Sequence, residues 1–198
     1  MIIIFDFDGT IHQTELAYKY ALEESLRELN LDINDFDYKS FIGMGPKDVW
    51  DKILNDNSNK DELIRKNGDR IIENMKSHGR LYDGVYETLA YLKDKYDLYI
   101  LSKCRNVYMD EARKFYGLDK YFSKYLISES YDFIDKYKIL AKEIKEDYIM
   151  IGDRQEDIEA ATRNNKEAIF AAYGYGSLDE AKGAKYIVDS IRELKNIL

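Results

Sequence analysis

The sequence predicts an α/β protein with a doubly wound parallel sheet and an inserted helical cap. Residues 2–5 form an unbroken apolar run, which is typical of a strand buried on both faces of a parallel sheet. From residue 81 onward, short apolar runs alternate with stretches of helical periodicity, which indicates βα units. Residues 13–80 have helical spacing, and this segment is too long for an ordinary crossover connection. The fold class follows from these three observations.

The change of periodicity also predicts the domain boundaries. Residues 1–12 and 81–198 are expected to form the α/β core domain, and residues 13–80 the helical cap, or lid. In the cap, Leu16 with Tyr20 and Ala17 with Ala21 begin an i, i+4 pattern that continues to Leu29. Further helices are predicted over 48–54 and 61–75, separated by polar turns such as 55–59, and no strand is expected there.

The remaining elements follow in order along the second half of the chain. Helices are predicted over 85–95, 108–116 and 158–162, with Gly117 closing the second of them, and residues 139–144 are expected to lie within a further helix. Strands are predicted over 98–101, 125–127, 148–151 and 168–172, followed by an edge strand over 186–188 and a terminal helix. In such a sheet the site lies beyond the carboxyl ends of the strands, so the polar residues at those ends should meet.

Composition and charge exclude several classes of partner. The chain has 198 residues, 45% of them hydrophobic, which is ample for a core. A net charge of −8 argues against nucleic acid or an anionic membrane surface as the partner. The single cysteine, Cys104, excludes an internal disulfide and fits a reducing compartment. With no signal peptide and no apolar run long enough to span a membrane, a cytoplasmic protein is expected.

Two carboxylates follow the first strand, at the centre of the predicted site. Asp6 and Asp8 leave the strand on one side, and Gly9 then allows the backbone to turn. Buried carboxylates are unfavourable unless a cation lies between them or one of them holds a proton. Both solutions indicate a reaction site, although turn aspartates at a strand end are a structural alternative.

Later strands end in side chains that suit a metal and a phosphate group. Asp153 follows the strand over 148–151, and Asp157 lies on the same side of the next helical turn. Together with Asp6 they provide hard oxygen ligands that suit Mg²⁺. Ser102 ends the strand over 98–101, where its hydroxyl could contact a phosphate oxygen or cap the following helix.

A lysine is needed to balance this negative charge. Lys136 and Lys138 both lie near a predicted helix start. Lys136 is the favoured candidate because Asp135 and Lys136 form the junction between loop and helix, and Lys138 is the fallback. His12 lies where the chain enters the cap and is assigned a hinge or surface role in preference to a substrate contact.

Taken together, these motifs resemble the four motifs of the haloacid dehalogenase superfamily. Their order and approximate spacing match, and the similarity spans the chain from residue 2 to about residue 157. Within the superfamily the sequence is similar to the phosphoglycolate phosphatase-like branch, in which 41–46 corresponds to the substrate loop of the lid. The third motif departs from its relatives, which often have Lys-Pro where this chain has Lys136-Tyr137. The motifs are Asp6-x-Asp8-Gly9-Thr10, Ser102-Lys103, Lys136 and Gly152-Asp153-x3-Asp157.

The resemblance implies a phosphatase that forms an aspartyl-phosphate intermediate. Asp6 would be the nucleophile and Asp8 the general acid and base. Mg²⁺ would be held by Asp6, the Asp8 carbonyl and Asp153, with Asp157 supporting it through water or Lys136. Ser102 and Lys136 would hold the transferring oxygens. The remaining residues of the expected substrate site are Gly9, Thr10, Lys103 and Gly43.

Several alternatives stay open from the sequence. The leading expectation is a Mg²⁺-dependent phosphomonoester hydrolase for a small phosphorylated metabolite, acting as a monomer or homodimer. A β-phosphoglucomutase-like phosphomutase is the alternative, although Thr10 favours hydrolysis because mutase-like relatives often have valine there. A dehalogenase is disfavoured, since a halide leaving group does not need the acid that Asp8 supplies. A non-catalytic relative is also conceivable, but Asp6, Asp8 and Asp153 are all present. Phosphoglycolate, a nucleoside monophosphate, pyrophosphate and a sugar phosphate all fit as substrates.

Overall fold

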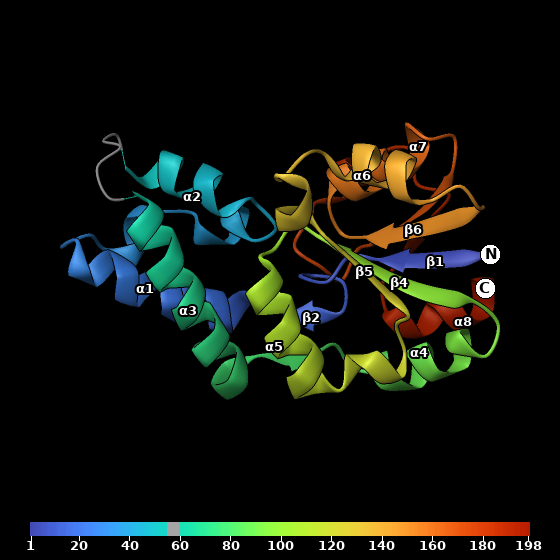
Figure 1. The fold of residues 1–198 in the computed structure, drawn as a ribbon, viewed down its shortest axis with the longest axis horizontal. Helices are drawn as coiled ribbons and strands as arrows, with labels where there is room; N and C mark the ends of the chain where they lie inside the picture. The colour runs from blue at the N-terminus through green and yellow to red at the C-terminus, as the bar shows by residue number, and fades with distance from the viewer. Residues whose placement is uncertain (55–59) are drawn as a thin grey trace.

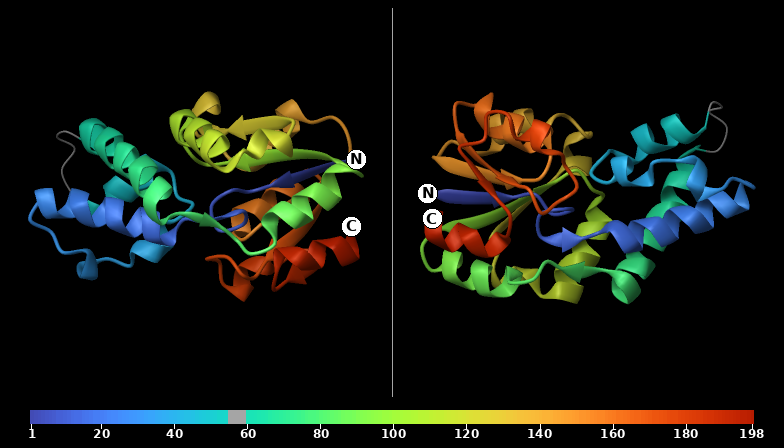
Figure 2. Two further views of the ribbon diagram at one scale, coloured as in Figure 1. Left: turned by 90° about the horizontal axis from the view of Figure 1, so that it is seen from below. Right: turned by 180° about the vertical axis from the view of Figure 1, so that it is seen from behind.

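A computed structural model describes residues 1–54 and 60–198 of the chain. The predicted polar turn over 55–59 lies outside these described residues. Most of the chain forms a sheet with helices on both faces, and three helices lie beyond one end of it (Figure 1). Both termini lie at the opposite end of the molecule (Figures 1 and 2).

The sheet has six parallel strands in the order β5-β4-β1-β6-β7-β8. The first strand of the chain is therefore central, with β4 and β6 as its neighbours. This arrangement confirms the predicted α/β fold with a doubly wound parallel sheet. The last strand lies at the sheet edge, as the sequence predicts. The bounds are β1 Ile2–Phe5, β4 Asp97–Ser102, β5 Lys124–Ile127, β6 Tyr148–Gly152, β7 Glu167–Ala171 and β8 Tyr186–Val188.

The helices lie close to their predicted positions. Helices α2, α5 and α7 begin two or three residues earlier than predicted, because the first residues of each carry no apolar periodicity. No helix of the described ranges combines the length and the hydropathy that a bilayer crossing requires. The bounds are α1 Glu15–Glu28, α2 Pro46–Ile53, α3 Lys60–His78, α4 Val85–Lys93, α5 Asn106–Tyr116, α6 Lys136–Glu143, α7 Gln155–Thr162 and α8 Leu194–Ile197.

The side chains of β1 alternate between two apolar cores. Ile3 and Phe5 pack in the core that includes residues of α4, α5 and α8. Ile2 and Ile4 pack on the opposite face, with residues of α6 and α7. Figure 1 shows α6 and α7 above the sheet and α4 and α8 below it. Because both faces are covered, β1 is apolar throughout, and Asp6 is the first polar residue beyond it.

Helices α1, α2 and α3 share an apolar cluster of their own, with Trp50 fully buried in it. In α1 the buried face includes Ala17 and Ala21, as the spacing predicts. The other predicted pair is exposed, since Leu16 and Tyr20 lie on the outer side of the helix. Tyr20 instead packs against the ring of the exposed His78, with ring centroids 4.5 Å apart.

A short antiparallel ribbon joins the sheet to these helices. It consists of β2 (His12–Gln13) and β3 (Arg80–Leu81), in which His12 pairs with Leu81. This ribbon is not predictable from the sequence, because two residues are too few for a strand periodicity to be visible. The ribbon pairs the segment that leaves the sheet for helices α1 to α3 with the segment that returns from them. It lies directly after the Asp6–Asp8 turn.

Candidate active site

Three buried aspartates meet at the carboxyl ends of β1 and β6. Asp6 follows β1, Asp153 follows β6, and Asp157 lies in the first turn of α7. One carboxylate oxygen of each lies within 4.8 Å of the others, and all three side chains are buried. Carboxylate oxygens at this spacing could hold a divalent cation.

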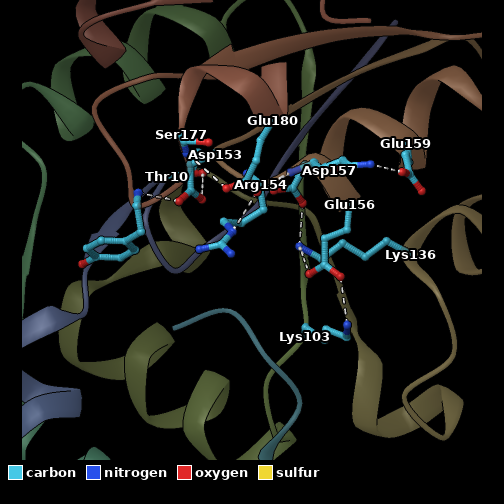
Figure 3. A network of polar contacts seen from close by, with 12 residues as sticks. Thr10, Lys103, Lys136, Asp153, Arg154, Glu156, Asp157, Glu159, Ser177 and Glu180 are labelled. Carbon is cyan, nitrogen blue, oxygen red and sulfur yellow. Dashed lines mark hydrogen bonds and ion pairs between the residues drawn. The ribbon is translucent and has the colours of Figure 1, made fainter. Parts of the chain in front are cut away.

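Lys136 lies among these aspartates. It is the first residue of α6, and its Nζ donates to Asp6 Oδ1 at 2.8 Å and to Asp157 Oδ1 at 2.6 Å. Figure 3 shows Lys136 reaching the acidic residues of α7, where Glu156 Oε1 lies 4.0 Å from the ammonium. The fallback candidate, Lys138, is exposed and pairs with Asp135 at 2.7 Å. Of the two lysines, the structure therefore brings Lys136 into the site.

The charges of this cluster are incompletely balanced. Burial raises the pKa of Asp6 to about 7, although Lys136 acts to lower it. Burial likewise raises the pKa of Asp153 and of Asp157 to about 7. Burial by itself would lower the pKa of Lys136, but Asp157 and Asp6 raise it well above its usual value. One ammonium leaves this group of carboxylates short of positive charge, so a divalent cation fits the site.

The turn after β1 packs against Asp153. Thr10 Oγ1 donates to Asp153 Oδ1 at 3.2 Å, and the backbone N–H of Tyr175 donates to Oδ2 at 2.8 Å (Figure 3). Gly9 has a φ of +86°, and a Cβ atom at this position would lie 2.3 Å from Asp153 Oδ2. Gly9 and Thr10, which the sequence analysis places in the substrate site, are thus in contact with Asp153.

The Asp8 carboxylate faces a different set of groups. Its Oδ1 accepts from Thr14 Oγ1 at 2.5 Å and from the Tyr108 hydroxyl at 2.8 Å. The sequence analysis did not single out either residue. Thr14 is only six positions away but belongs to no recognised motif, and Tyr108 reaches Asp8 only because α5 packs beneath β1.

Behind Asp8 lies His12, which is fully buried and not at the surface. Its Nδ1 is 2.8 Å from Thr14 Oγ1, and its Nε2 is 2.9 Å from the Tyr116 hydroxyl. Thr14 has one hydroxyl proton, which it donates to Asp8, so it must accept the proton of His12 Nδ1. The surface role considered for His12 is therefore wrong, while its position in β2 is that expected for a hinge.

The polar groups open into a partly open cavity between the sheet and helices α1 to α3. The far wall is largely apolar and includes Phe41, Ile42 and Trp50. Lys103 is on the wall, but its Nζ is held by Glu156 at 2.8 Å (Figure 3). Gly43 comes from the segment that enters α2. The predicted site residues that line the cavity are Asp6, Asp8, Gly43, Ser102, Lys103 and Lys136.

The fold and this site define a family of hydrolases. The family model described as "haloacid dehalogenase-like hydrolase" matches residues 3–171, so the chain belongs to this family. A haloacid dehalogenase-like hydrolase from Streptococcus pneumoniae has the same fold, with a TM-score of 0.87 and 18% identity over 99% of this chain and 97% of that one. The resemblance inferred from the motifs is thereby confirmed.

Curated relatives place the chain more narrowly. A phosphoglycolate phosphatase from Aquifex aeolicus is 27% identical over 190 residues, which are 90% of this chain and 87% of the relative. The pyrophosphatase PpaX of Oceanobacillus iheyensis is 24% identical over 209 residues, which are 99% of this chain and 95% of the relative. The chain is thus a phosphatase of the phosphoglycolate phosphatase-like branch, as predicted, while these relatives differ in the substrate that their names give.

Proposed function

We propose that the protein is a Mg²⁺-dependent phosphomonoester hydrolase that works through an aspartyl-phosphate intermediate. The observation that carries this proposal is the position of Asp6, buried between Lys136 and two further aspartates at the floor of the cavity. Asp8, two residues further along, reaches the same cavity from the next turn of the chain. A nucleophile and a separate acid–base group thus both face the space that a phosphate ester would enter.

The chemistry then divides into two steps. Lys136 contacts Asp6 Oδ1, so Oδ2 is the oxygen expected to attack phosphorus. As the bond between phosphorus and the leaving oxygen breaks, Asp8 donates a proton to the alcohol. Asp8 then takes a proton from the attacking water, and the bond between phosphorus and Asp6 breaks to release inorganic phosphate.

The remaining site residues position the phosphate and balance its charge. Ser102 and Lys136 line the cavity beside Asp6, where a hydroxyl and an ammonium suit the transferring oxygens. When bound, Mg²⁺ would be held by Asp6, Asp153 and the Asp8 carbonyl and would neutralise negative charge between nucleophile and phosphate. Asp157, whose oxygens accept from Lys136 and from the backbone of Arg154, would keep the lysine in place.

Residues 13–80 are proposed to act as a cap over this site. Helices α1 to α3 share an apolar cluster of their own, and they supply the far wall of the cavity. The β2–β3 ribbon is the connection at which the cap would move relative to the core domain of residues 1–12 and 81–198. Closure would exclude water from the phosphate.

A phosphate-release assay tests the proposal. The purified protein, given a panel of phosphate monoesters and pyrophosphate, should release phosphate with Mg²⁺ and lose that activity in EDTA. Asp6→Asn should lower kcat by at least about 10³-fold, because the amide cannot act as the nucleophile. Asp69→Asn, at an exposed position of α3, is the matched control and should leave kcat unchanged. Near-native activity of Asp6→Asn would contradict the nucleophile assignment.

A phosphomutase is the alternative, because it would use the same nucleophile and acid–base group, Asp6 and Asp8, which both line the cavity. The two reactions differ in their products. A phosphomutase would isomerise a sugar phosphate without net release of phosphate, whereas the proposed hydrolase releases it. Phosphorus NMR of the reaction mixture distinguishes these outcomes directly.

A further inference from the structure

Two buried polar groups on the wall of the active-site cavity have nothing to bind. Across the chain outside residues 55–59, Arg105 Nη1 and the Tyr18 hydroxyl are both shielded from solvent and make no hydrogen bond. Both residues line the cavity that also holds Asp6 and Asp8. A buried donor without an acceptor is unfavourable, so the fold keeps these two groups at a cost in stability.

The surroundings of Arg105 indicate that the sequence keeps this unpaired donor in place despite the loss of stability. The residue follows β4 in the core, and its Nε lies 3.5 Å from Glu129 Oε1. The other end of the side chain reaches the cap at Gly68, where an added Cβ would lie 2.6 Å from Arg105 Nη1. Gly68 lies in the interior of α3, where glycine is less favourable than alanine. The glycine thus leaves room for the guanidinium beside the cap.

A third donor lies on the same wall. Asn67 is buried in α3, and its Oδ1 accepts from the Ser25 hydroxyl at 2.9 Å. Its carbonyl oxygen is therefore in use, and its amide N–H groups are the part available to a ligand. Arg105, Tyr18 and Asn67 all offer donors, so a group that satisfied them would be an acceptor. The guanidinium pairs with Glu129 through Nε, and its unpaired Nη1 donor favours an acceptor with negative charge.

We propose that Arg105, with Tyr18 and Asn67, binds an anionic group on the alcohol side of the substrate, either a carboxylate or a second phosphate. The inference rests on the proposed function and narrows its substrate class to phosphate esters whose leaving group is itself an anion. Esters of neutral alcohols, including nucleoside monophosphates, would offer these donors no anionic acceptor.

Matched substrates test this selectivity. Phosphoglycolate and ethyl phosphate share a two-carbon skeleton and differ in the carboxylate, while propane-1,3-diol bisphosphate and propyl phosphate differ in the second phosphate. In at least one pair, the wild-type kcat/KM should be higher for the ester that carries the second anionic group. For each pair, the selectivity ratio is the kcat/KM of the ester with the second anionic group divided by that of the ester without it. The pair with the larger ratio identifies whether a carboxylate or a phosphate is bound.

Arg105→Met should lower that ratio by about 10- to 100-fold, the range expected for a hydrogen bond to a charged group. Tyr18→Phe should lower it by a smaller factor without lowering Tm, since the hydroxyl that it removes makes no bond in the protein. Arg65→Met is the matched control. This arginine lies on α3, is 60% exposed, and pairs with Asp69, so its loss should leave the ratio unchanged.

Gly68→Ala provides a test that does not depend on removing a buried charge. The new methyl group would displace the Arg105 guanidinium, so the ratio should fall although Arg105 is still present. The Tm should stay the same or rise, because alanine favours the helix. If Arg105 had only a structural role, Gly68→Ala would not lower the ratio while leaving the Tm unchanged or higher.

The outcomes separate this inference from the function on which it rests. Phosphate release that is equally efficient for both members of each pair would overturn the inference and leave the phosphatase proposal intact. So would a ratio that is unchanged in both Arg105→Met and Gly68→Ala. No phosphate release from any ester by the wild-type protein would overturn the proposed function, and this inference with it.

Discussion

At the scale of single residues, Lys136 is the cation on which the buried site depends. It is held between Asp6 and Asp157, and its side chain is 2% exposed. Lys136→Met should lower the free energy of unfolding by about 3 to 5 kcal/mol at pH 8, because it leaves buried carboxylates without their partner. It should also abolish phosphate release. Urea denaturation followed by circular dichroism measures the first effect, and a phosphate assay the second.

Lys138→Met is the matched control, two residues further along the same helix. This side chain is 51% exposed and pairs with the exposed Asp135. Its removal should leave the free energy of unfolding and kcat nearly unchanged, because exposed ion pairs contribute little. A larger effect on kcat from Lys138→Met than from Lys136→Met would exchange the roles proposed for the two lysines.

Tyr108 is a second residue whose substitution should act on a single group, the Asp8 carboxylate. Its hydroxyl and that of Thr14 are the two donors to Asp8 Oδ1. Tyr108→Phe should reduce kcat by about 10-fold, since a hydrogen bond to a charged group contributes about 1.5 to 3 kcal/mol and one donor remains. KM should change less than kcat, because Asp8 is proposed to act on the leaving oxygen. Steady-state kinetics separate the two parameters. A change in KM alone would indicate that Tyr108 contacts the substrate.

At the scale of an element, the turn after β1 is the most constrained segment of the site. Gly9 and Gly183 both have positive φ, but only at Gly9 would a Cβ clash with a carboxylate. Gly183→Ala should cost about 1 to 2 kcal/mol from backbone strain alone. Gly9→Ala should cost more and should also abolish the expected rise in Tm on adding Mg²⁺, because it displaces Asp153. Thermal unfolding with and without Mg²⁺ measures both effects. If Gly9→Ala and Gly183→Ala lost the same stability and showed the same change in Tm with Mg²⁺, the contact between Gly9 and Asp153 would have no effect on stability or metal binding.

At the scale of the whole molecule, the buried aspartates should govern how stability depends on pH. The folded-state pKa of Asp6, Asp153 and Asp157 is raised to about 7, above the value of about 4 in an unfolded chain. Between these values the folded protein binds more protons than the unfolded chain. The stability that this provides is complete below about pH 4 and is lost as pH rises through 7. Glu111 has a pKa that Lys76 and Lys114 lower from 4.5 to about 2, so its contribution to stability is constant above about pH 4.5 and is lost only as the pH falls below that value.

The metal-free protein in EDTA should therefore have a higher Tm at pH 5.5 than at pH 8. Added Mg²⁺ should reverse the difference, because a cation favours the ionised carboxylates and competes with protons for them. The rise in Tm on adding Mg²⁺ should accordingly be larger at pH 8. Differential scanning fluorimetry at the two pH values measures this. An equal rise at both values would argue against a metal site made of these aspartates.

The fold was largely predictable because its signals are local. The apolar run of β1 and the alternation after residue 81 indicated a parallel sheet, since a strand covered on both faces has to be apolar. The β2–β3 ribbon was missed, because two residues carry no periodicity. The exposure of Leu16 and Tyr20 was missed as well, because i, i+4 spacing identifies a helical face without showing which face is buried.

For the site, the sequence alone determined that Asp6, Asp8, Asp153 and a lysine belong near one sheet edge, because parallel strands bring their carboxyl ends together. Only the tertiary structure decided between Lys136 and Lys138, since both lie within one turn of the helix start. It alone placed Tyr108 against Asp8 and Arg105 against Gly68. Those contacts join residues far apart in the chain, and they depend on how helices pack against the sheet and against one another, which no local pattern encodes.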